Sequence, residues 1–104
     1  MVMDVRFLSN PYFVEDLKDL PGTDPRIQDF VMGFEEARDF LSRFQTLMEY
    51  LLPLYEREGK AYLTVALGCT GGKHRSVALS EKLGEYLERK GLPHSVSHRD
   101  VGKE

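Results

Sequence analysis

The stretch that decides the fold is residues 61–76, AYLTVALGCTGGKHRS. Its first part, Ala61–Leu67, is mostly apolar and lies between Gly59 and Gly68. Such a run is typical of a strand buried on both faces, in the centre of a sheet. The polar, glycine-rich part that follows, Gly68–Ser76, leads directly into helical spacing of apolar residues. The stretch therefore predicts a central strand that continues through a tight loop into a helix.

The N-terminal segment predicts a strand, a long loop and a short helix. Val2–Leu8 alternates apolar and polar residues, and the turn-forming residues 9–11 end this predicted strand. The loop over residues 11–25 contains three prolines and is long for so small a chain. Asp24 and Pro25 are a favourable start for a helix over Arg26–Met32.

The remaining segments predict two longer helices and a last strand. A main helix begins at Phe34, because apolar residues then recur at steps of three and four, and Pro53 should kink or end it. A second helix follows the glycine-rich loop and stops at Gly91. His94–His98 predicts the last strand. Residues 1–104 should thus form one α/β domain, a small parallel or mostly parallel sheet with flanking helices and a ligand crevice at the carboxyl ends of the strands.

Composition excludes several classes of protein. The chain has 14 Lys and Arg against 17 Asp and Glu, a net charge of −3, so it is not a generally basic nucleic-acid binder. One cysteine permits no internal disulfide, and neither a zinc-binding pattern nor a nucleotide-binding glycine motif occurs. No apolar run approaches the roughly 20 residues of a membrane span. We therefore expect a cytoplasmic protein without metal, cofactor or membrane association.

The loop Gly68–Ser76 predicts a phosphate site. Its glycines allow backbone N–H groups to converge, the following helix begins with partial positive charge, and three successive basic residues add donors. The alternative is a tight turn with solvated basic residues. The predicted phosphate ligands are Cys69, Thr70, Gly71, Gly72, Lys73, His74, Arg75 and Ser76.

The same loop also satisfies Cys-x5-Arg-Ser, the pattern of cysteine-dependent phosphatases. In that alternative Cys69 would be the nucleophile and Arg75 would hold the phosphate oxygens. No histidine precedes the cysteine, and no general-acid loop is evident, although four acids could approach it: Asp4, Asp19, Asp24 and Asp100. Cys69 could equally be a small buried residue that closes a strand.

Further ligand candidates lie where the first and last strands end. Asp4, Arg6 and Asn10 should reach the same edge as Cys69, as should His98 and Arg99. The alternatives are an ion pair between Asp4 and Arg6, and an exposed polar tail at the C-terminal end.

Taken together, these motifs resemble the C-terminal domain of the RapZ family, that is, of the RNase adapter or nucleotide-binding proteins. The motifs that carry the resemblance span nearly the whole chain: Asp4-Val5-Arg6-Phe7-Leu8, Asn10-Pro11, Leu20-Pro21-Gly22-Thr23-Asp24, Tyr62-Leu63-Thr64-Val65-Ala66, Gly68–Ser76 and His98-Arg99-Asp100.

The resemblance implies a domain that senses an amino-sugar phosphate, glucosamine 6-phosphate, and that follows an N-terminal P-loop domain in the family. It also implies a phosphofructokinase-subdomain-like fold, self-association and, in some bacteria, RNA presented to ribonuclease E. We therefore expect a sensor or adapter without chemistry of its own, whose partners are a phosphorylated small molecule and RNA or a protein. RNA binding should be weak and salt-dependent at a net charge of −3.

Overall fold

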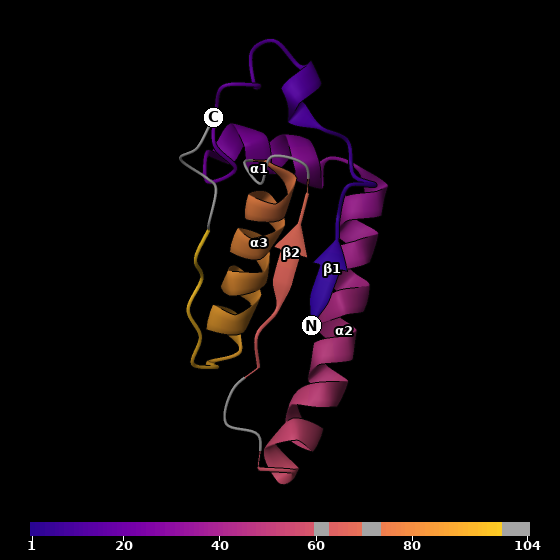
Figure 1. Ribbon diagram of the computed structural model, residues 1–104, viewed down its shortest axis with the longest axis vertical. Coiled ribbons are helices and arrows are strands. Elements are labelled where there is room, and N and C mark those ends of the chain that lie inside the picture. Colours follow the sequence, from indigo (N-terminus) through magenta and orange to yellow (C-terminus); the bar gives the residue numbers. More distant parts are fainter. Residues whose placement is uncertain (60–62, 70–73, 99–104) are drawn as a thin grey trace.

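The computed structural model describes residues 1–59, 63–69 and 74–98. Two short strands, one 3-10 helix and three α-helices follow one another along these residues (Figure 1). In chain order they are β1 (Val2–Asp4), η1 (Pro11–Phe13), α1 (Pro25–Met32), α2 (Glu35–Arg57), β2 (Ala66–Gly68) and α3 (Arg75–Arg89).

The sheet consists of β1 and β2, which pair in parallel. Val2 is opposite Ala66 and Asp4 is opposite Gly68, and the N–H of Val5 donates to the Gly68 carbonyl at 2.8 Å. The α/β class, with a small parallel sheet and flanking helices, is therefore confirmed. Both strands end at the same edge of the sheet, which places the residues that follow them side by side.

Among the described residues, helices cover only one face of the sheet. Met3, Leu63 and Val65 pack against a cluster formed by α2 and α3, with Phe44, Met48, Leu83 and Tyr86 at its centre. The opposite face is open, since Val2, Ala66 and Gly68 are exposed. The prediction of a strand buried on both faces is wrong for the described part of Ala61–Leu67, because no second layer covers this face and the strand alternates between covered and exposed positions.

A second cluster lies at the end of the sheet where the strands finish. It joins the loop after β1, the short helix α1 and the first turns of α3, and its fully buried members include Val5, Ile27 and Leu79. Leu67 of β2 and Cys69, directly after that strand, pack against it. The carboxyl edge of the sheet thus rests on a packed core, which gives the beginning of α3 a fixed position.

The helix predictions are confirmed with small differences. Asp24 caps α1, since its Oδ1 accepts the N–H of Arg26 at 2.9 Å, and Pro25 is the first helical residue. α2 does not end at Pro53 but continues to Arg57. Packing explains this continuation, because Leu52 beside the proline lies against the cluster between α2 and α3 and offsets the lost backbone hydrogen bond.

Two strand predictions are wrong in extent or kind. β1 ends at Asp4 rather than Leu8, because the chain turns and the N–H of Leu8 donates to the Val5 carbonyl. Residues 92–98 form no strand and instead run along α3 (Figure 1). Val96 is the one apolar side chain of the predicted strand His94–His98, and it packs directly over Gly84, where an added Cβ would lie 2.8 Å from Val96 Cγ2. Within the described ranges no helix has the length and apolar character to cross a membrane.

Candidate functional site

The two strands and the residues that follow them line a shallow pocket of about 290 Å³. It is lined by residues of β1, of β2 and of the turns that follow them: Val2, Met3, Asp4, Arg6, Gly68 and Cys69. The parallel pairing of Asp4 with Gly68 is what brings these residues together. The pocket therefore lies at the carboxyl edge of the sheet, where ligands bind in open α/β sheets.

Arg75, the first residue of α3, is the most unusual side chain of this region. It is only 5% exposed. Its Nη1 donates to the carbonyl of Arg6 at 2.7 Å and to that of Leu8 at 3.2 Å. Its Nε is buried and has no hydrogen-bond partner among the described residues. A buried charged donor without a partner is costly, so this atom calls for an explanation.

Cys69 contacts the first turn of α3 through its sulfur. The backbone N–H of Ser76 donates to Sγ at 3.4 Å, and the Ser76 hydroxyl oxygen lies 3.3 Å from the same sulfur. Ser76 is buried, and Cys69 is half-buried at the pocket and packs against the core beside Leu67. Cys69 therefore packs against the core, as one of its predicted alternatives requires, and also forms part of the pocket wall.

Asp4 and Arg6 form a bidentate ion pair on the pocket rim. Arg6 Nε lies 3.0 Å from both carboxylate oxygens, Nη2 lies 2.7 Å from Oδ2, and the backbone N–H of Arg6 also donates to Oδ1. The Arg6 side chain, followed by its N–H and the charge of Arg75, lowers the pKa of Asp4 to about 2. The carboxylate is therefore ionised at neutral pH, and the predicted alternative of a mutual ion pair is what the structure contains.

The other predicted site residues fall into two groups. Thr70, Gly71, Gly72, Lys73 and Arg99 lie outside the described residues. Three described residues lie near elements other than the pocket wall. His74 is buried directly before α3, Asn10 caps η1 by accepting the Tyr12 N–H, and His98 Nε2 lies 2.8 Å from Glu81 on the side of α3.

The sequence patterns did not indicate that Val2 and Met3 line the pocket. They also did not indicate that Arg75 binds the carbonyls of Arg6 and Leu8. Val2 could have been found from strand alternation, because it shares the open face with Asp4, whereas Met3 lies on the covered face. The carbonyl contacts join residues 67 to 69 positions apart and leave no signal in the sequence.

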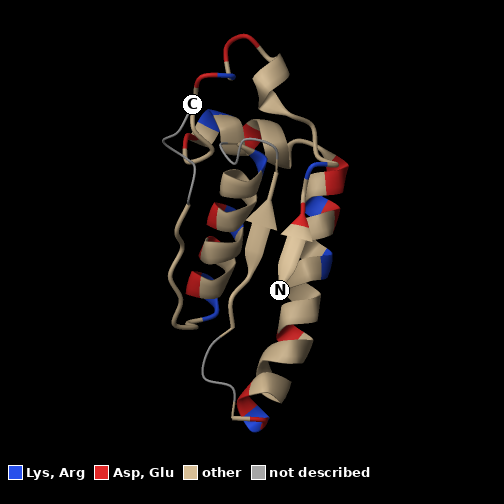
Figure 2. Cartoon of the chain, in the orientation of Figure 1, with Lys and Arg blue, Asp and Glu red and all other residues tan. Residues whose placement is uncertain are grey.

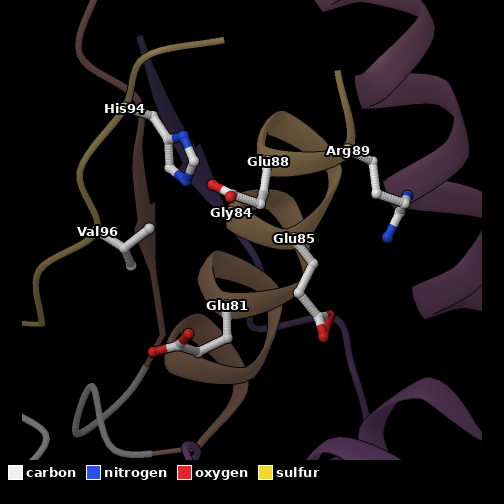
Figure 3. Close-up of a pocket in the computed structure, with 7 residues that line it drawn as sticks. All are labelled: Glu81, Gly84, Glu85, Glu88, Arg89, His94 and Val96. Atoms are coloured by element: carbon white, nitrogen blue, oxygen red, sulfur yellow. The ribbon is translucent and has the colours of Figure 1, made fainter. Parts of the chain in front are cut away.

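A larger hollow of about 450 Å³ lies between α3 and the C-terminal segment. Figure 3 shows His94 and Val96 of that segment beside the helix that carries Gly84 and the glutamates. Three carboxylates line the hollow, from Glu81, Glu85 and Glu88, with one arginine, Arg89. This predominance of negative charge opposes a phosphate, so the smaller pocket is the better candidate for an anionic ligand.

Charge is mixed over the helices. Figure 2 shows Lys and Arg interspersed with Asp and Glu along α2 and α3. The ion pairs Arg43–Asp39 and Lys82–Glu85 use some of these basic groups within a single helix. In the part of the chain that the structure describes, neither helix carries a continuous basic stripe for a nucleic-acid backbone.

Comparison with known proteins identifies relatives over the whole chain. Residues 1–102 match the family described as the RapZ C-terminal domain. A nucleotide-binding protein of Geobacter metallireducens is 58% identical over 103 residues, which are 99% of this chain and 36% of the relative. One of Anaeromyxobacter sp. strain K is 59% identical over 104 residues, which are 100% of this chain and 35% of the relative. The chain thus spans little more than a third of the length of the curated relatives it matches.

Proposed function

The chain belongs to the RapZ C-terminal domain family, and on that premise we propose that it is a sensor or adapter domain that binds a phosphorylated metabolite beside the start of α3. The ligand is an amino-sugar phosphate such as glucosamine 6-phosphate. Its phosphate lies against Arg75 and the loop that ends at Ser76, and its remaining part occupies the pocket rimmed by Asp4 and Arg6.

The observation that carries this proposal is the buried Nε of Arg75. A guanidinium binds an oxyanion through two parallel N–H bonds, and Nε belongs to one of the edges that can do so. Nη1 already holds two backbone carbonyls, whereas Nε has no partner among the described residues. A phosphate oxygen would satisfy this donor.

The surroundings favour the same kind of ligand. The N-terminus of α3, a helix of 15 residues, adds the partial positive charge that favours anions. Asp4 supplies an ionised carboxylate on the pocket rim, which suits an ammonium or a hydroxyl group on the non-phosphate part of the ligand. The site therefore offers both charges that an amino-sugar phosphate requires.

A cysteine-dependent phosphatase is the competing function, and one observation favours it. The sulfur of Cys69 accepts the N–H of Ser76 and lies near its hydroxyl, as a nucleophile in a Cys-x5-Arg-Ser loop would. Two of the four candidate general acids argue against it. The pKa values of Asp4 and Asp24 are both lowered by a neighbouring arginine, so neither carboxyl group carries a proton for a leaving group at neutral pH. We therefore place binding before catalysis.

The biological role that we propose is ligand-dependent interaction in the cytoplasm. The relatives are named nucleotide-binding proteins. We assign any nucleotide binding to the part of those longer proteins that this chain does not match, and the phosphorylated metabolite to this domain. RNA or a protein partner, and self-association, belong to the same proposal, with RNA bound weakly for the reasons of charge given above.

Titration calorimetry tests the proposed ligand. Glucosamine 6-phosphate, glucosamine and inorganic phosphate are compared at equal ionic strength. We expect saturable binding of the phosphorylated sugar, weaker binding of phosphate and none of glucosamine. Arg26→Lys serves as the matched control, because Arg26 makes a local ion pair with Asp24 away from the pocket. Equal binding of glucosamine and its phosphate would contradict a phosphate site.

A further inference from the structure

Resting on the proposed function, we infer that Arg75 is a positioning residue that couples occupancy of the phosphate site to the conformation of residues 6–13. One edge of its guanidinium holds the backbone of this segment, and Nε is left for the anion. A ligand phosphate would fix the guanidinium, and the guanidinium would in turn fix the segment.

The first step is the hydrogen bonding of Arg75 to the segment. Nη1 donates to the carbonyls of both Arg6 and Leu8, which are two residues apart, so the contact holds a turn rather than a single point. Among the described residues, one other backbone–backbone bond closes this turn, in which the Leu8 N–H donates to the Val5 carbonyl at 3.2 Å. Because few backbone bonds hold this turn, a change in the mobility of the guanidinium should alter its stability.

The second step is that the segment continues from this turn into η1. Leu8 is buried in the core, and Pro11, three residues later, is buried as well. Asn10 accepts the Tyr12 N–H through its side chain and the Phe13 N–H through its carbonyl. Stabilising the turn at Leu8 should therefore stabilise the start of η1, since only two residues separate Leu8 from η1 and both Leu8 and η1 contact α1.

The third step concerns what the segment presents to solvent. It carries three exposed aromatic side chains, namely Phe7 at 57%, Tyr12 at 60% and Phe13 at 82% exposure. Phe7 packs edge-on against Phe40 of α2, and Tyr12 packs edge-on against Phe13. A segment that orders when the ligand binds would thus change the presentation of an aromatic surface outside the pocket.

Hydrogen exchange with mass spectrometry tests the coupling directly. The chain is measured alone, with glucosamine 6-phosphate, and with inorganic phosphate. The informative amides are those of Arg6, Leu8, Tyr12, Phe13 and Val14, which the structure shows hydrogen-bonded within or next to the segment. We expect their exchange to slow by at least about fivefold at saturation, the lower end of typical coupling between sites. Peptides from residues 45–55 of α2 should not change.

Arg75→Lys separates positioning from charge. Lysine keeps one positive charge but cannot hold two carbonyls and an anion with one planar group. We expect the variant to retain measurable phosphate binding and to lose the slowing of exchange over residues 6–13, whereas Arg26→Lys should behave as the unmodified chain.

The outcomes distinguish the two proposals. Saturable binding to the unmodified chain without slower exchange in residues 6–13 would overturn the coupling and leave the phosphate site intact. Absence of binding by calorimetry would overturn the phosphate site, and the coupling with it. The unmodified chain decides both points, so they remain testable even if Arg75→Lys does not fold.

Discussion

Arg6 and Arg75 lie at the same edge of the sheet and differ in almost every physical respect. Arg6 is exposed and is paired locally with Asp4, two residues before it. Arg75 is buried, binds carbonyls 67 to 69 positions away, and retains an unpartnered Nε among the described residues. The pocket rim thus contains a local Asp-x-Arg pair of the kind that Asp24 and Arg26 also form. The donor without a partner among the described residues, to which we assign the ligand, belongs instead to an arginine that the fold has buried.

Removal of the buried arginine should have the largest effect. Arg75→Met eliminates two hydrogen bonds from a charged donor and leaves the carbonyls of Arg6 and Leu8 without it. We expect the free energy of unfolding to fall by about 2 to 3 kcal/mol and sugar phosphate binding to weaken by about 1.5 to 3 kcal/mol. Urea unfolding and calorimetry measure the two effects. An unfolding free energy equal to that of the unmodified chain would show that the buried contacts contribute nothing.

Removal of the exposed arginine should separate affinity from stability. Arg6→Gln breaks an ion pair in which both side chains are more than half exposed, so the midpoint of urea unfolding should stay close to that of the unmodified chain. The affinity for glucosamine 6-phosphate should fall by about tenfold or less, because the pocket rim loses one charge. If Arg6→Gln destabilised the chain as much as Arg75→Met, the contrast between the two arginines would be lost.

Cys69→Ser tests whether the contact between the sulfur and Ser76 serves catalysis. A sulfur that only packs and accepts a weak hydrogen bond can be replaced with a change in affinity within about tenfold, or about 1.4 kcal/mol. We also expect no phosphate release by the unmodified chain from aryl or sugar phosphates over pH 5 to 8. Turnover that disappears in Cys69→Ser would establish the phosphatase instead.

The smallest effect should be on the decrease of the free energy of unfolding at low pH. Arg6 lowers the pKa of Asp4 from 3.8 to about 2, so its contribution to stability is complete above about pH 4 and is lost as the pH falls toward 2. Asp4→Asn should flatten that part of the curve of stability against pH. Asp24→Asn is the matched comparison, because Arg26 lowers the pKa of Asp24 in the same way at a helix cap. If both variants lost stability at low pH as the unmodified chain does, the lowered pKa values of Asp4 and Asp24 would not be the cause of that loss.

The sequence predicted those elements whose signal is local. The short helix after Asp24 was predictable from its cap and Pro25, and the pairing of Asp4 with Arg6 from their spacing on a strand. The open face of the sheet was not predictable, because a run such as Ala61–Leu67 does not reveal how many layers cover it. The conformation of His94–His98 depends on Gly84, which lies ten residues before His94. Because Gly84 has no side chain, Val96 can approach the helix.

The same division applies to the site. Cys69, Arg75 and Ser76 were predicted from their pattern, and the structure brings them together at the start of α3. The direction of the Arg75 side chain was not predictable, since it depends on carbonyls supplied by the turn after β1. Spacing thus predicted which residues lie together, and only the fold shows which donor has no partner among the described residues.

The most direct test of the account is the Nε–Hε resonance of Arg75 in the nuclear magnetic resonance spectrum of the ¹⁵N-labelled chain, identified by its absence from Arg75→Lys. Glucosamine 6-phosphate is titrated in, with glucosamine as the control. We expect a saturable downfield shift of the Hε proton with the phosphorylated sugar, because the buried donor acquires an oxyanion acceptor, and no shift with glucosamine. If the sugar phosphate shifted other resonances in a saturable way while the Arg75 Hε resonance did not move, the proposed contact between Arg75 and the phosphate would be contradicted.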